Sequence, residues 1–304
     1  WKQISGEFNS SSKSYNSKDL LAKIVHHHAS EIAGHFSPLM YKFATIAVPR
    51  MLTGLLQTVS WKSVRSMLPG QQDLRGRLHI EGKLDQIRKL TNTGTVLLVP
   101  MHYSNLDSIL MGYALYAIGL PPYCYGAGLN LFSNIIFGFF MNNLGAYKVD
   151  RKKRHDLYKI ILKNYSTTIL ERGAHSLFFP SGGRSRSGGI PRHLKLGLLG
   201  TGLEAYINNL IKNKSKPNIY VVPCGISYHF TLEASTLIDD FLSEQGKSRY
   251  IIEDDESSKP KQVAQFLLKF FTNSSKIYMN IGQALDPFGH LVDDDGNSIS
   301  EAGK

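Results

Sequence analysis

Short apolar segments recur along the chain from about residue 76, with longer mixed or polar stretches between them. Apolar runs of strand length, bounded by Gly, Pro or polar residues, are typical of strands that are buried on both faces. We therefore predict strands at 78–82, 95–101, 122–126, 146–150, 175–179, 219–227 and 276–282.

The stretches between these strands are long enough for helices. Predicted helices lie near 104–118, 130–141, 153–171, 193–212, 233–245 and 260–272. Alternating strands and helices predict an α/β fold, in which a largely parallel central sheet is flanked by helices on both faces. In such sheets ligands bind in the loops beyond the carboxyl ends of the strands, so chemistry is expected in those loops.

The first 75 residues have a different pattern and predict an N-terminal helical region. Residues 19–35 form a polar helix whose three adjacent histidines, His26 to His28, point in different directions and do not converge on one metal ion. Residues 38–60 are strongly apolar, but charges interrupt them and Pro49 is expected to break or kink a helix.

That apolar stretch is therefore not expected to be a clean transmembrane span. A pair of helices that packs on the core, or that dips into one membrane leaflet, fits the pattern better. We divide the chain into a helical region at 1–75, which is a candidate for membrane association, and an α/β domain at 76–304.

Composition and charge narrow the possible partners. An apolar fraction of 42% is enough for a core, and the net charge of +11 indicates an anionic partner such as nucleic acid, an acidic membrane, an acidic carrier protein or a phosphorylated substrate. Residues 145–195 carry twelve Lys and Arg against three Asp and Glu. The only cysteines, Cys124 and Cys224, exclude a disulfide framework and favour a reducing compartment.

The first candidate for chemistry is an H-x4-D pattern, His102 to Asp107, directly after the predicted strand at 95–101. With His102 in the loop and Asp107 in the first helical turn, the two side chains can meet. An imidazole that is oriented by a carboxylate can take a proton from an alcohol near neutral pH. The structural alternative is that Ser104 and Asp107 form a capping box and His102 only fills the loop.

The second candidate is the Gly-rich segment 178–189, which follows the predicted strand at 175–179. Its glycines allow close approach of a ligand, its arginines suit phosphate and its serine hydroxyls add donors. The segment is neither a Walker A loop nor a nucleophile elbow. The candidate phosphate-binding residues are Ser181, Gly182, Gly183, Arg184 and Arg186. The alternative is a flexible basic loop.

Two further segments complete the set. The run Arg151 to Arg154 ends a predicted strand, and Arg151 or Lys153 is expected to help bind the same phosphate while the remaining cations face solvent. The segment 221–228 is an apolar strand that, taken alone, indicates a buried strand of the core.

In this order and spacing, the four blocks resemble the glycerol-phosphate acyltransferase superfamily over roughly residues 95–230. The blocks are His102…Asp107, Gly145…Arg151, Phe179-Pro-Ser-Gly-Gly-Arg184 and Val222-Pro…Tyr228. The superfamily includes glycerol-3-phosphate and 1-acylglycerol-3-phosphate acyltransferases. Many members carry Glu where Ser181 stands here, a departure that favours glycerol-3-phosphate as the acceptor.

The resemblance implies an acyltransferase of phospholipid synthesis that moves a fatty acyl group from acyl-CoA or acyl-carrier protein to the sn-1 hydroxyl of glycerol-3-phosphate, with lysophosphatidate as the alternative acceptor. His102 is the implied base and Asp107 the residue that orients it. No metal or organic cofactor and no nucleic-acid partner are expected. The implied location is the cytoplasmic face of a membrane, peripheral or monotopic, on an anionic surface, with 36–70 and 129–141 lining an acyl groove or touching the bilayer.

Three other interpretations remain open at this stage. A hydrolase or phosphatase would use His102 and the Gly-rich loop, although no nucleophile is placed for it. A binding module would use the basic region 145–195 to hold nucleic acid or anionic lipid, but no nucleic-acid fold signature accompanies that charge. An inactive scaffold would not need both His102 and Asp107.

Overall fold

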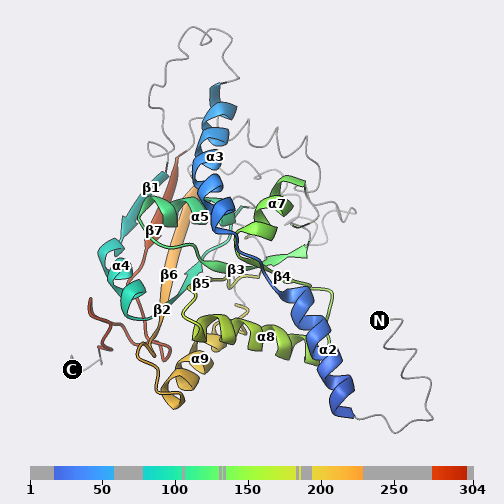
Figure 1. Ribbon diagram of the computed structural model, residues 1–304. Coiled ribbons are helices and arrows are strands. Elements are labelled where there is room, and N and C mark those ends of the chain that lie inside the picture. The colour runs from blue at the N-terminus through green and yellow to red at the C-terminus, as the bar shows by residue number, and fades with distance from the viewer. Residues whose placement is uncertain are drawn as a thin grey trace, which may run out of the picture.

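The structure is a computed structural model that describes residues 17–57, 78–104, 107–129, 132, 135–182, 185, 194–228 and 276–299. The predicted helices at 233–245 and 260–272 lie outside these residues. Within them the chain forms an α/β fold around one sheet of seven strands (Figure 1). The strands are β1 (Leu78–Gly82), β2 (Thr95–Pro100), β3 (Cys124–Gly128), β4 (Ala146–Val149), β5 (Ser176–Leu177), β6 (Ile219–Tyr228) and β7 (Ile277–Ile281).

The sheet has the order β1-β7-β6-β2-β5-β3-β4. All neighbouring pairs are parallel except β6 and β7, which are antiparallel. The prediction of a largely parallel sheet is confirmed, and each predicted strand is present with ends that move by a few residues at most. Because β2, β5, β3 and β4 run the same way, the loops that follow them meet at one edge of the sheet.

Helices cover both faces of the sheet, as predicted. On one face α4 (Leu84–Thr93) and α5 (Asp107–Ala117) bury Leu90, Leu110 and Met111 against alternate residues of β2 and β6. On the other face α8 (Asp156–Glu171) and α9 (Gly200–Ile211) lie side by side (Figure 1) and bury Leu170 and Ala205. Strand β2 serves both cores, because successive side chains of a strand point to opposite faces.

The N-terminal region contributes two helices, α2 (Ser17–Ile32) and α3 (Pro38–Gln57). Helix α2 packs on the domain through Ile32, which is fully buried with Tyr147, Tyr158 and Ile161. Helix α3 is a single helix that continues past Pro49, so of the two expectations for that proline, a break or a kink, the break is wrong. A proline in a helix interior removes one hydrogen bond, and the remaining ladder tolerates that loss here.

Three other helices differ from the prediction. Helix α4 was missed, although Leu84, Ile87 and Leu90 stand three residues apart and two of them are buried. The helix predicted at 130–141 is α7, Ile135–Asn143, and the one predicted at 193–212 begins only at Gly200. None of the described helices is long and apolar enough to cross a membrane.

Candidate active site

His102 and Asp107 meet at the carboxyl edge of the sheet. His102 lies in the loop after β2 and Asp107 is the first residue of α5. The Nδ1 atom of His102 lies 2.8 Å from Oδ2 of Asp107. Because His102 lies before the helix and Asp107 begins it, the two side chains can meet, whereas a continuous helix would hold these positions apart.

Asp107 is fully buried and has a hydrogen-bond partner on each oxygen. Besides His102, Oδ2 accepts the backbone N–H groups of Tyr103 at 2.7 Å and Ser104 at 2.9 Å. Oδ1 accepts the hydroxyl of Tyr228, the last residue of β6. The bond from Ser104 is the backbone half of the predicted capping box, so the same carboxylate caps α5 and orients His102.

These contacts assign the proton on the imidazole. Oδ2 already accepts two backbone N–H groups, which makes it an acceptor, so Nδ1 of His102 is the donor in their bond. Nε2 then carries the free lone pair. The carboxylate therefore holds His102 in the tautomer that a general base requires.

Two further contacts hold His102 in place, one on the face of its ring and one on its backbone. Phe179, after β5, stacks on it with ring centroids 4.2 Å apart. The backbone N–H of Ser185 donates to the carbonyl of His102 at 2.7 Å. The Gly-rich segment is therefore tied directly to the loop that carries the histidine.

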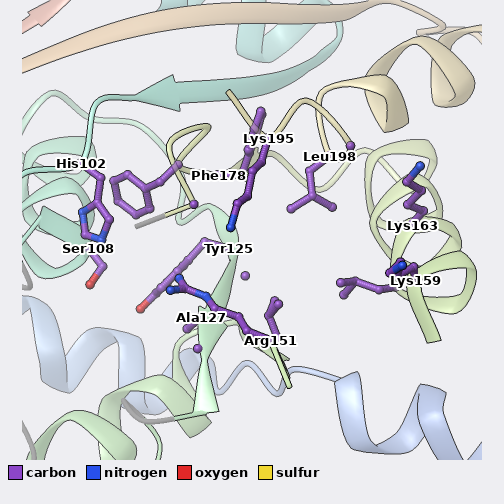
Figure 2. Close-up of a pocket in the computed structure, with 17 residues that line it drawn as sticks. His102, Ser108, Tyr125, Ala127, Arg151, Lys159, Lys163, Phe178, Lys195 and Leu198 are labelled. Carbon is purple, nitrogen blue, oxygen red and sulfur yellow. The ribbon is translucent and has the colours of Figure 1, made fainter. Parts of the chain in front are cut away.

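A cavity of about 370 Å³ opens beside His102 at this edge of the sheet. Its walls come from the ends of β3 and β4, from the segment after β5, from α8 and from residues just before α9. Among the described residues, no carboxylate lines the cavity. Four cationic side chains do: Arg151, Lys159, Lys163 and Lys195. Figure 2 shows His102 and Ser108 at one end of the cavity and the α8 lysines at the other.

The structure brings together only part of the predicted set. Arg151 and Gly182 line the cavity, and Ser181 precedes Gly182 on the same turn. Lys153 is not in the lining, because its Nζ pairs with Glu31 of α2 at 2.5 Å. Gly183, Arg184 and Arg186 lie outside the described residues.

Gly182 has a conformation that explains why glycine stands there. Its φ of 65° lies in the left-handed region, where side chains are unfavourable. A Cβ at this position would also come within 2.5 Å of the side chain of Lys195. Glycine thus lets Lys195 lie across the turn at the cavity wall.

Sequence reasoning missed Tyr228, Lys159, Lys163 and Lys195. Tyr228 was assigned to the core because an apolar strand does not indicate a hydrogen bond to a carboxylate 121 residues away. The two α8 lysines stand four residues apart and so share a helix face, and this spacing could have indicated a paired cationic site. Lys195 stands six residues after the Gly-rich segment 178–189, and nothing in that spacing predicts that it lines the cavity.

Cys224, which lies near Asp107, is not a candidate nucleophile. Cys224 lies on β6 and is buried. Burial, together with the nearby charge of Asp107, raises the pKa of its thiol to about 12. A thiol with such a pKa is protonated at neutral pH and unreactive.

Comparison with known proteins places this site in a family. Residues 80–227 match the family model described as Acyltransferase. A glycerol-3-phosphate acyltransferase of Pasteurella multocida is 32% identical over 68% of this chain and 24% of its own length. Proteins with the same name from Pseudoalteromonas translucida and Pseudomonas paraeruginosa are 28% and 29% identical, over 70% and 56% of this chain.

The chain spans about a quarter or less of the length of these curated relatives. The covered share is 24% for the proteins of Pasteurella multocida and Pseudoalteromonas translucida and 20% for that of Pseudomonas paraeruginosa. The matched range 80–227 contains His102, Asp107 and the whole described lining of the cavity. The chain therefore carries an acyltransferase domain of the glycerol-phosphate acyltransferase superfamily.

Proposed function

We propose that this chain transfers a fatty acyl group from acyl-CoA or acyl-carrier protein to the sn-1 hydroxyl of glycerol-3-phosphate, a step of phospholipid synthesis. The observation that carries the proposal is the His102–Asp107 pair at the end of a cavity lined by four cations. The pair suits the activation of a hydroxyl, and the cations suit a phosphorylated molecule that bears it. The names of the relatives agree with both parts.

In the first step, the acceptor hydroxyl gives its proton to Nε2 of His102 as its oxygen bonds to the thioester carbonyl carbon. Asp107 stabilises the imidazolium that results, through the bond at Nδ1. In the second step, the tetrahedral intermediate collapses and the carbon–sulfur bond breaks. The leaving thiolate takes the proton back from His102, so the products are an ester and a free thiol. Both steps use only the substrates and His102, so the proposal needs no metal or organic cofactor.

The acceptor's phosphate is assigned to the cations at the middle of the cavity. Figure 2 shows Arg151 and Lys195 between His102 and the far end. Arg184 and Arg186 of the Gly-rich segment remain candidates on sequence grounds. A phosphate held here leaves the glycerol hydroxyl free to point at His102.

The choice of acceptor is tested by supplying labelled palmitoyl thioester with either glycerol-3-phosphate or 1-acylglycerol-3-phosphate. The proposal predicts transfer to glycerol-3-phosphate, with the label at sn-1 after positional hydrolysis of the product. Transfer to the lysolipid alone would keep the chemistry and replace the acceptor. Release of free fatty acid without any ester product would instead favour a hydrolase.

We also propose that the protein binds the cytoplasmic face of an anionic membrane as a peripheral or monotopic protein. Support comes from α3, where Leu39, Phe43 and Ile46 have exposures of 79%, 53% and 52%. Their spacing places these residues on one side of the helix, and an exposed apolar stripe of this kind is typical of an interfacial helix.

Phe43→Glu tests the membrane proposal in co-sedimentation with vesicles that contain anionic lipid. We expect the bound fraction to fall several-fold, because a charge replaces an apolar contact with the acyl chains. Phe288→Glu, which changes a 62% exposed phenylalanine that packs on Tyr206 of α9, is the control. Equal binding of Phe43→Glu and wild type would contradict a role for α3.

A further inference from the structure

The cavity contains more positive charge than one acceptor phosphate accounts for. Four cations line it, whereas a phosphate monoester carries about two negative charges at neutral pH. Like charges that share one cavity repel one another unless anions lie between them. Arg151 and Lys195 already match the charge of the acceptor, which leaves Lys159 and Lys163 for another anionic group.

The two α8 lysines form a separate group. They stand four residues apart on one helix, so their side chains project from the same face. Figure 2 places both at the end of the cavity opposite His102, beside Leu198. A three-carbon acceptor whose hydroxyl is at His102 and whose phosphate is at Arg151 and Lys195 does not extend to them.

Among the described residues, neither lysine head is held in a buried ion pair. Lys159 pairs with Asp156 at 3.0 Å, but both side chains are mostly exposed, and such a pair contributes little. The Cε atom of Lys163 would lie 3.4 Å from a Cβ on Gly197, so the lysine stem runs along the glycine backbone. The side chain of Lys163 therefore passes Gly197, and both residues line the cavity.

We propose that Lys159 and Lys163 form a second anion subsite, which binds the phosphate of the donor's phosphopantetheine arm. This inference rests on the proposed function, because it assigns that phosphate to a thioester donor. Coenzyme A and acyl-carrier protein share this phosphate, and both are too large to enter a cavity of about 370 Å³ entirely. Cations at the rim would hold the phosphate while the arm passes Leu162 and Leu198 and brings the thioester toward His102.

The test measures binding without turnover, by calorimetry on the full chain with 4′-phosphopantetheine and with pantetheine that lacks the phosphate. Lys159→Gln/Lys163→Gln removes both heads and keeps the stems. Lys83→Gln/Lys89→Gln is the matched control, because it removes two exposed positive charges at α4, on the other face of the sheet.

We expect the α8 double variant to weaken phosphopantetheine binding about tenfold or more, since charge-assisted hydrogen bonds to phosphate are lost. The control should bind as wild type does, and pantetheine should bind all three proteins equally weakly. The proposal is overturned if the α8 variant binds phosphopantetheine normally. It is equally overturned if the variant loses affinity for glycerol-3-phosphate or for anionic vesicles instead.

A second arm identifies the part of the donor that is recognised. The KM for acyl-CoA and for acyl-carrier protein should both rise in the α8 variant, while the KM for glycerol-3-phosphate stays within about twofold. A rise for acyl-CoA alone would assign the lysines to the nucleotide phosphates and overturn the phosphopantetheine assignment. The donor subsite and the acyltransferase function can fail separately. If wild type transfers no acyl group but still binds phosphopantetheine through these lysines, only the acyltransferase function is refuted.

Discussion

At the scale of single residues, Asp107 is the centre of the site. One buried carboxylate caps α5 through the N–H of Ser104, fixes the tautomer of His102 and accepts the hydroxyl of Tyr228. One carboxylate thus makes both the capping contact and the contact with His102 that the H-x4-D pattern predicts. The sequence predicted the contact between His102 and Asp107, because both follow one strand within a single turn.

Tyr228→Phe tests whether the hydroxyl on Oδ1 positions Asp107. The variant keeps the ring and leaves Oδ1 without this donor in a buried place, which loosens the orientation of the carboxylate and of His102. We expect kcat to fall about tenfold with little change in the KM for glycerol-3-phosphate.

Tyr278→Phe, on the neighbouring strand β7, is the control for loss of a tyrosine hydroxyl. A purely structural role of Tyr228 would lower the melting temperature and leave kcat of the folded enzyme unchanged. That outcome would remove Tyr228 from the positioning of Asp107.

At the scale of elements, the strands were predictable and their order was not. Continuous apolar runs such as 219–227 identify buried strands locally, whereas the place of β6 between β7 and β2 depends on contacts far apart in sequence. Helix α4 was missed because its run is short and mostly polar. The break predicted at Pro49 is absent because a proline disturbs only its own helical turn, and the helix can continue on both sides of it.

The attachment of α2 gives a prediction at the same scale. Ile32 is fully buried among Tyr147, Tyr158 and Ile161, and the neighbouring Glu31 pairs with Lys153 at the surface. We expect Ile32→Ala to lower the free energy of unfolding by about 2–4 kcal/mol, because it leaves a cavity. Glu31→Gln should cost less than about 1 kcal/mol.

Urea denaturation of both variants and wild type measures this difference. The opposite order, with Glu31→Gln the more damaging, would mean that the ion pair rather than the apolar contact holds α2 on the domain.

At the scale of the whole molecule, the cationic cavity is a product of the fold. Arg151 follows β4, Lys159 and Lys163 lie on α8, and Lys195 precedes α9. The charge count over 145–195 predicted a basic region, and the parallel sheet predicted the edge where it would gather. Which cations face the cavity depends on tertiary packing, and so Lys153 was expected there while its Nζ instead reaches Glu31.

Stability of the whole fold should depend on pH through His175. Its Nδ1 accepts the N–H of Val96 at 3.0 Å, which ties β5 to β2, and burial lowers its pKa from 6.5 to about 4. The neutral form is favoured in the folded state, so its contribution is complete above pH 6.5 and is lost as the pH falls from 6.5 through 4. Linkage sets the loss at no more than about 3 kcal/mol.

Urea denaturation of wild type and His175→Gln between pH 7 and pH 4 measures this contribution. We expect the variant to be less stable at pH 7 and the two proteins to converge toward pH 4. A stability difference that stays constant over this range would show that His175 does not titrate with folding.

The most direct test of the central claim is acyl transfer to glycerol-3-phosphate by wild type, His102→Gln and the control His35→Ala, which changes an exposed histidine. Glutamine can still donate to Asp107 but cannot act as a base. We expect His102→Gln to lose about 10²–10⁴-fold in kcat while its melting temperature and its affinity for glycerol-3-phosphate stay near those of wild type. His102→Gln that turns over like wild type and His35→Ala would contradict the account.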